Sequence, residues 1–88
     1  MWRVELTYKA QQDLANLDRP VRRHIIERLE WFAENFTSTQ PSPLHADWKG
    51  FYKVRFSSWR VVYSFSTRDS CITVHYIDRR DKVYKRRL

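Results

Sequence analysis

The sequence predicts an α+β fold, in which a hairpin of two helices packs on one face of a small, largely antiparallel sheet, in the order β-α-α-β-β-β. Three observations lead to this prediction. Apolar residues recur at helical spacing over residues 10–36, strand-like alternation fills residues 51–77, and a stretch rich in serine and proline separates the two. Helices followed by a run of strands are typical of the α+β class.

The length and composition fit one domain spanning residues 1–88. The chain has 88 residues, 42% of them hydrophobic, and only one glycine and three prolines, which excludes collagen-like and low-complexity proteins. No apolar run approaches the roughly 20 residues that cross a bilayer, and residues 1–6 do not resemble a signal peptide. We therefore expect a cytoplasmic protein that does not bind membranes. The single cysteine, Cys71, is expected to pack as a small hydrophobe.

The first strand and both helices follow from apolar spacing. Residues 2–6 alternate apolar and charged side chains, as a strand with one buried face does. Thr7 is placed to cap a helix in which Ala10, Leu14 and Leu17 share a face, and Pro20 suits the first turn of a second helix. The second helix carries a longer apolar stripe, made of Val21, Ile25, Ile26, Leu29, Phe32, Ala33 and Phe36. We expect both helices to pack on the same sheet.

Residues 37–50 are predicted to form a loop, because they show no periodic pattern and are rich in serine, threonine and proline. Strands are predicted at 51–56, 59–65 and 71–77, and residues 83–88 suit either a short edge strand or a tail. His24 is expected on the helix surface and His45 in the loop. Neither these histidines nor His75 has the spacing of a metal-ligand pair, and a structural role is the simpler interpretation for each.

Positive charge is concentrated in the second half of the chain. The 17 basic and 10 acidic residues give a net charge of +7. Residues 1–44 carry six basic and six acidic residues, whereas residues 45–88 carry eleven and four. This segregation indicates an anionic partner for the C-terminal half. The alternative is a basic surface that serves solubility alone.

A two-residue turn at Ser57-Ser58 would fix the register of the strands on either side. Arg55 then lies opposite Arg60, and Lys53 falls on the same face as both. The other face is wholly apolar or aromatic and is predicted to pack under the helices: Tyr52, Val54, Phe56, Trp59, Val61 and Tyr63. Like charges at paired positions destabilise a hairpin, so we interpret the three cations as an anion site. An exposed face that merely tolerates them is the alternative.

Residues 78–84 follow the last predicted strand and are placed to reach over the open face of the sheet. Arg80 would add a fourth cation there, and Tyr84 would add a phenol with acid–base capacity. A solvated basic tail is the alternative interpretation. His75 would lie on the cationic face beside Arg60 if it points to that side of its strand.

Together these residues resemble the RelE/ParE superfamily of bacterial toxins and, within it, the RelE-like mRNA interferase branch. The resemblance covers about residues 4–85. Its strongest parts are residues 52–55, which read YKVR, residues 59–63, which read WRVVY, and residues 77–84. Residues 14–23 resemble the first helix pair of the family, and residues 44–47 resemble the loop before its hairpin. Members share the α+β fold predicted above.

The resemblance implies the toxin of a type II toxin–antitoxin system, which cleaves mRNA in the ribosomal A site. The ribose 2′-OH would attack the adjacent phosphate and leave a 2′,3′-cyclic phosphate. The implied partners are a cognate antitoxin, the ribosome and mRNA, and no cofactor or metal is implied. Catalysis would fall to Lys53, Arg55, Arg60, Arg80 and Tyr84. Five further basic residues are expected to bind RNA: Lys49, Arg79, Lys82, Lys85 and Arg86.

One departure from the family pattern bears on the mechanism. Arg79, preceded by Asp78, stands where many relatives have a histidine, so acid–base chemistry would rest on Tyr84, or on His75 if it reaches the site. The ordinary pKa of tyrosine is about 10, and neighbouring cations favour the phenolate.

Two alternative functions stay open. One is a ParE-like toxin that inhibits DNA gyrase by binding, although such chains generally lack the set of cations and tyrosine found here. The other is a degenerate member that binds only its antitoxin or RNA. In every case we expect the apolar helix stripes to offer a docking groove for an antitoxin segment.

Overall fold

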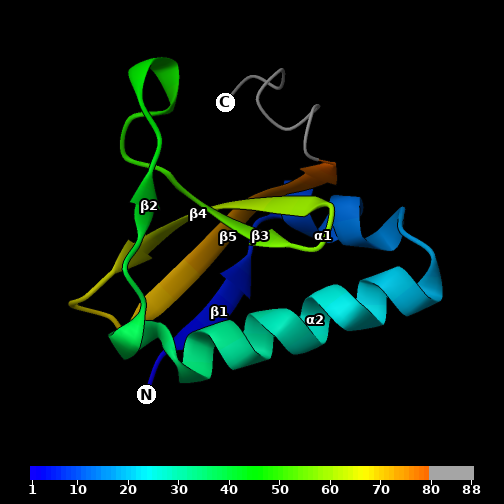
Figure 1. Ribbon diagram of the computed structural model, residues 1–88, viewed down its shortest axis with the longest axis horizontal. Coiled ribbons are helices and arrows are strands. Elements are labelled where there is room, and N and C mark those ends of the chain that lie inside the picture. Colours follow the sequence, from blue (N-terminus) through cyan, green and yellow to red (C-terminus); the bar gives the residue numbers. More distant parts are fainter. Residues whose placement is uncertain (80–88) are drawn as a thin grey trace.

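The computed structural model describes residues 1–79, so the predicted edge strand or tail at 83–88 lies outside the described residues. The elements, with η for a 3-10 helix, are β1 (Arg3–Leu6), α1 (Tyr8–Ala15), α2 (Arg19–Glu34), η1 (Phe36–Ser38), β2 (Ser42–Pro43), η2 (Ala46–Trp48), β3 (Tyr52–Phe56), β4 (Trp59–Ser66) and β5 (Cys71–Arg79). In Figure 1, α2 lies below the sheet and η2 projects above it.

The strands form one five-stranded sheet in the order β1-β5-β4-β3-β2. β1 runs parallel to β5, and every other neighbouring pair is antiparallel. The long β4–β5 hairpin therefore lies inside the sheet, β1 forms the edge beside β5, and β2 forms the opposite edge. The α+β class and the largely antiparallel sheet predicted from the sequence are confirmed.

Both α-helices begin where the sequence predicts. The Thr7 hydroxyl accepts a hydrogen bond from the Ala10 backbone N at 3.2 Å, which satisfies an N–H that has no partner inside α1. Asp18 is the N-cap of α2, and Pro20 lies in its first turn, where the missing N–H costs no helical bond. Leu17 lies beyond the end of α1 but still packs against the core. Neither of these two helices is long and apolar enough to cross a membrane.

The main core lies between the helices and the inner face of the sheet. Phe32 is at its centre, with its ring 5.2 Å from the rings of Phe36 and Tyr63 and 6.2 Å from that of Phe56, all edge to face. Burial, with a smaller contribution from Tyr52, raises the pKa of Tyr63 to about 12. The six hairpin residues assigned to this face are all buried in the core or packed against it. That prediction is confirmed.

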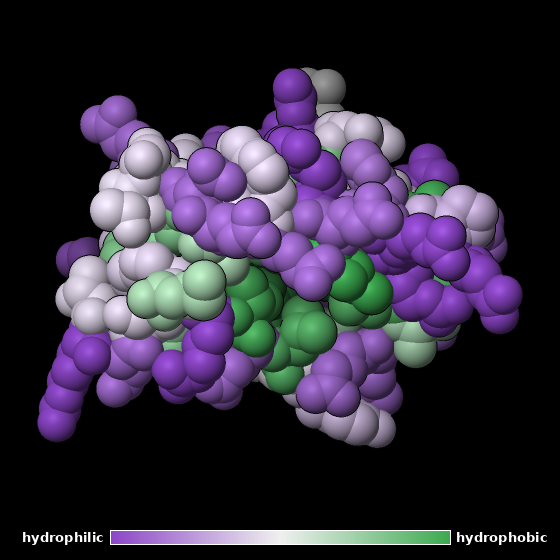
Figure 2. Space-filling model, turned by 90° about the horizontal axis from the view of Figure 1, so that it is seen from below, coloured by the Kyte–Doolittle hydropathy of each residue, from purple (hydrophilic) through white to green (hydrophobic). Residues whose placement is uncertain are grey.

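Most of the apolar helix stripes are part of this core, so little of them is free to form a docking groove, and the docking of an antitoxin segment there stays a prediction. Ile25, Leu29 and Phe32 are at most 4% exposed beneath the sheet. Ile26, which was assigned to the stripe, is 42% exposed, because it lies about 100° around the helix from Ile25. Figure 2 shows the side seen from below, where apolar surface remains as a central patch enclosed by hydrophilic side chains.

The segment predicted as a loop at 37–50 contains a short edge strand. In β2, Ser42 pairs with Lys53 and Pro43 pairs with Tyr52. The sequence could not indicate this strand, because two residues cannot show alternation. Proline is tolerated there because an edge strand need not donate every backbone N–H.

Replacing Phe32 with alanine is expected to lower the free energy of unfolding by about 3–5 kcal/mol, because it empties the centre of the aromatic core. A urea titration followed by circular dichroism measures the loss. The matched control is Trp31→Ala, one position earlier in α2, where the side chain is 49% exposed and a change within about 0.5 kcal/mol is expected. Equal losses in the two variants would contradict this placement of the core.

Candidate functional site

The outer face of the sheet, turned away from α2, carries the cations that the hairpin register predicts. Arg55 lies opposite Arg60 across the two-residue turn Ser57-Ser58. Ser57 has a φ of 58°, in the left-handed region that tight hairpin turns require. Because side chains alternate along a strand, Lys53 shares the outer face with both arginines. The predicted register is confirmed.

An open hollow of about 260 Å³ lies among these cations. We call it the cationic hollow; it is lined by Ser42, Lys53, Val54, Arg55 and Arg60. Lys53 and Arg60 are half-buried, whereas Arg55 is exposed. Two guanidinium groups and one ammonium group suit a phosphate, which they bind through charge-assisted hydrogen bonds. Within residues 1–79, no group of three or more His, Cys, Asp or Glu side chains could hold a metal ion.

A carboxylate residue is the neighbour of Arg60 on the strand away from Arg55. Asp78 of β5 lies across from Arg60 on β4, so Arg60 has a cation opposite it on one neighbouring strand and an acid on the other. Opposite charges at paired positions stabilise a sheet, and Asp78 therefore offsets part of the repulsion from Arg55. The Asp78 carboxylate also accepts a hydrogen bond from the Arg79 backbone N at 2.8 Å. The sequence alone gave no signal for this pairing, which depends on the register of β5 against β4.

The segment around η2 covers the part of the outer face next to the cations. Leu44, Trp48 and Phe51 pack against Val62 and Tyr76 in a second, smaller core. The Trp48 ring meets Tyr76 and Phe51 edge on, with centroids at 5.7 and 6.1 Å. The sheet is thus covered at one end of its outer face and open at the cationic end.

His75 lies on the outer face but not beside Arg60, whose partner on β5 is Asp78. It is the extra residue of a β-bulge in β5, and its Nε2 is 2.8 Å from the Ser64 Oγ. The Phe51 ring packs edge on against the imidazole at 4.9 Å. Burial lowers the pKa of His75, so the imidazole is neutral at pH 7. The geometry indicates a packed, structural histidine.

The residues predicted to bind RNA are not all brought together. Lys49 is exposed directly after η2. The Arg79 guanidinium lies 5.5 Å from the ring of Trp59, an inner-face residue, and lines a separate hollow of about 290 Å³ with Asp13. Arg79 is therefore apart from the cationic hollow. The remaining predicted site residues lie outside the described part of the chain: Arg80, Lys82, Tyr84, Lys85 and Arg86.

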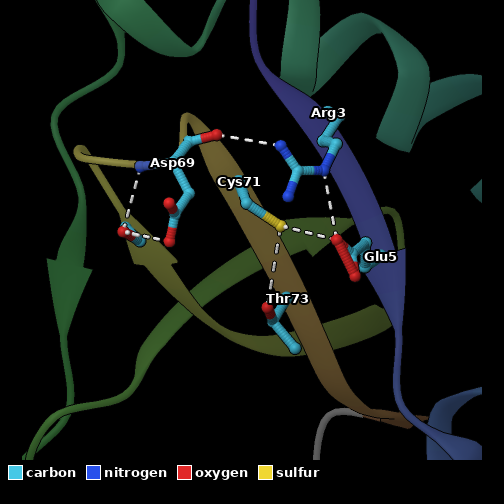
Figure 3. A network of polar contacts seen from close by, with 6 residues as sticks. Arg3, Glu5, Asp69, Cys71 and Thr73 are labelled. Carbon is cyan, nitrogen blue, oxygen red and sulfur yellow. Dashed lines mark hydrogen bonds and ion pairs between the residues drawn. The ribbon is translucent and has the colours of Figure 1, made fainter.

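Figure 3 shows a polar network at the far end of the outer face, where β1 meets β5. The Cys71 Sγ donates to the Glu5 Oε1 at 3.4 Å, and the Arg3 guanidinium contacts the same oxygen at 3.1 Å. Hydrogen bonds from Cys71 and then from Arg3 hold the pKa of Glu5 below its usual range. Burial raises the pKa of Cys71, so the thiol stays protonated. Cys71 is a buried structural residue, as predicted.

Replacing Arg55 with threonine is expected to raise the free energy of unfolding by about 0.2–1 kcal/mol, because it removes the like-charge pair with Arg60. The gain should shrink in high salt, which screens the repulsion. Urea titrations at low and high salt measure both effects. Arg68→Thr, in the exposed turn between β4 and β5, is the control and should change stability little. Lower stability in Arg55→Thr would refute the repulsion.

The thermal stability of the protein is expected to fall as the pH drops through 6.5, the ordinary pKa of histidine. Because burial lowers the pKa of His75, the unfolded chain takes up a proton at a pH where the folded chain does not, and acid favours unfolding. Above that pH, His75 is neutral in both the folded and the unfolded chain, so it no longer makes stability depend on pH. Melting curves between about pH 8 and pH 5 measure the slope. His75→Gln should flatten it, whereas His24→Gln, on the exposed side of α2, should not. An unchanged slope in His75→Gln would contradict this assignment.

Comparisons with known proteins identify the family and the fold of the chain. The sequence pattern of the family described as "ParE toxin of type II toxin-antitoxin system, parDE" matches residues 4–84. No curated protein sequence matches the chain significantly.

Solved structures share the fold at low sequence identity. The toxin–antitoxin complex RelBE2 from Mycobacterium tuberculosis matches with a TM-score of 0.79 and 19% identity, over 90% of this chain and 98% of that chain. The isolated E. coli RelE toxin matches with a TM-score of 0.72 and 18% identity, over 97% and 93%. The archaeal RelE–RelB complex from Pyrococcus horikoshii matches with a TM-score of 0.68 and 18% identity, over 93% and 98%. The chain belongs to the ParE toxin family of type II toxin–antitoxin systems, within the RelE/ParE superfamily that the resemblance in the sequence indicated.

Proposed function

We propose that this toxin is a ribosome-dependent endoribonuclease that cleaves mRNA in the A site. The cationic hollow is the observation that carries the proposal. Lys53, Arg55 and Arg60 meet there although the facing arginines repel each other. A surface that served folding alone would gain stability by losing one of the two arginines. The arrangement is therefore better explained by an anionic ligand held at this point.

The proposed reaction is an attack within the RNA strand. The ribose 2′-oxygen forms a bond to the adjacent phosphorus, the bond to the 5′-oxygen breaks, and the products are a 2′,3′-cyclic phosphate and a 5′-OH. Negative charge grows on the phosphate oxygens in the transition state. The cations around the hollow would stabilise that charge, which is usually the largest catalytic contribution. The half-burial of Lys53 and Arg60 strengthens their effect, because solvent screens them less.

Two proton transfers complete the reaction. The 2′-hydroxyl loses its proton during the attack, and the leaving 5′-oxygen gains one. We assign the first proton to the Tyr84 phenolate and the stabilisation of the leaving oxygen to Arg80, both outside the described residues. His75 is given no part, because its Nε2 contacts Ser64 and Phe51 packs against its ring.

A cognate antitoxin is the proposed partner. Solved structures with this fold include complexes of RelE-type toxins with RelB antitoxins. On α2, the exposed Ile26 lines an open hollow of about 320 Å³ together with three arginines, Arg19, Arg22 and Arg23. An apolar side chain amid cations suits an acidic, amphipathic segment of a partner protein.

Inhibition of DNA gyrase by binding is the second candidate. The match of the chain to a ParE toxin pattern favours it. In that case the cationic hollow would serve binding alone, and no RNA would be cut. The two candidates therefore differ in a product that can be measured directly.

Inducible expression in a bacterial host, with mapping of mRNA 5′ ends within minutes of induction, separates these functions. The wild-type protein is expected to arrest growth and to produce new 5′ ends inside translated codons. Arg60→Ala should reduce cleavage by about 100- to 1,000-fold, the usual effect of removing one group that stabilises transition-state charge. Tyr84→Phe should abolish cleavage, because phenylalanine cannot take the 2′ proton. Arg68→Ala removes an equal charge from an exposed turn and should remain toxic.

Circular dichroism of each purified variant establishes that the protein is folded, and Arg60→Lys tests whether charge alone is enough. A folded, fully toxic Arg60→Ala protein would overturn the site assignment. Growth arrest with DNA-damage signals and no new mRNA ends would assign the gyrase function instead. A folded wild-type protein that causes no arrest would identify a degenerate binding member.

A further inference from the structure

A further hollow, of about 430 Å³, lies beside the cationic hollow and is formed by the segment around η2. We call it the η2 hollow; it is lined by Leu44, His45, Ala46, Asp47, Trp48 and Lys53. Lys53 lines both hollows. A ligand in one hollow and a ligand in the other would therefore meet at a single ammonium group.

The aromatic wall of the η2 hollow is held in place before any ligand binds. Trp48 is half-buried, and the rings of Tyr76 and Phe51 pack against it at interplanar angles of 79° and 80°. Val62 closes the same cluster from beneath and is fully buried. A ring that is already fixed loses little conformational freedom when a ligand stacks on it.

The backbone of the η2 hollow is also ordered. Ala46 has a φ of 56°, in the left-handed region that residues other than glycine seldom adopt. Hydrogen bonds hold it on both sides: Leu44 N donates to Phe51 O at 2.9 Å, and Lys49 N donates to Ala46 O at 3.0 Å. Unusual backbone held by its surroundings is a feature of ligand sites.

The chemistry of the lining suits an unpaired nucleic-acid base. Indole and imidazole rings offer stacking surfaces, and the Asp47 carboxylate can accept hydrogen bonds from a base edge. We propose that the η2 hollow binds one unpaired RNA base next to the scissile phosphate, with Trp48 as the stacking platform and Lys53 on the phosphate between the two hollows. This inference rests on the proposed ribonuclease function and adds to it a means of recognising the substrate.

The test measures the affinity of the toxin for a short, fluorescently labelled 2′-O-methyl RNA, which has no free 2′-OH and cannot be cleaved. A second oligonucleotide of the same length carries abasic sites in place of its bases. Base–aromatic stacking predicts that the wild-type protein binds the intact strand about 5- to 150-fold more tightly than the abasic strand. Fluorescence anisotropy at low salt gives both dissociation constants.

Trp48→Ala should bind the intact strand as weakly as the wild-type protein binds the abasic one, and Trp48→Phe should restore most of the difference. Trp31→Ala removes an exposed tryptophan from α2 and should leave both affinities unchanged. A merely structural role for Trp48 would lower the affinity for both strands equally, which would overturn the proposal. The comparison of the two oligonucleotides uses the wild-type protein alone, so it does not depend on whether a variant folds.

The outcomes for the subsite and for the nuclease function are distinguishable. Wild-type protein that cuts mRNA in cells but binds both strands equally would overturn the η2 subsite and leave the nuclease intact. A preference for the intact strand that Trp48→Ala abolishes, without mRNA cleavage in cells, would support the base subsite and overturn the nuclease. Wild-type protein that binds neither strand would overturn the subsite.

Discussion

The pairing of β3 with β4 across the turn Ser57-Ser58 is the constraint on which the rest of the structure depends. This register places Arg55 opposite Arg60, and it sends Phe56, Val61 and Tyr63 to the other side of the sheet. A slip of one residue would exchange the two faces and bury cations in the aromatic core. The core and the cationic hollow are therefore products of one choice of register, and neither can change without the other.

The outer face shows how a small domain holds a repulsive cluster of charges. The aromatic core on the inner face stabilises the hairpin, so the like-charge pair is tolerated. Asp78 on the opposite side of Arg60 reduces the net repulsion. The η2 segment covers the neighbouring part of the face with Trp48 and Phe51. Among the described residues, the cations line an open hollow, which concentrates the positive field where a phosphate would bind.

Short-range patterns in the sequence were enough to predict the helices, the Thr7 cap, the hairpin register and the residues of the inner face. The features that escaped prediction depend on contacts between distant segments. β2 is too short to show alternation, and its pairing partner is Lys53, eleven positions after Ser42. The register of β5 against β4 has no local signal in the sequence, so alternation alone could not show that Asp78, and not His75, lies opposite Arg60. The packing of Trp48 on Tyr76 likewise has no local signature.

One fold can carry unrelated functions, so the fold alone does not decide between cleavage and binding. The side chains of the outer face decide it, because they can change without disturbing the core on the inner face. In this chain that face combines three cations with an adjacent hollow walled by a fixed tryptophan. The proposed ribonuclease function gives both features a use, because single-stranded RNA presents phosphates for the cations and bases for the tryptophan in alternation.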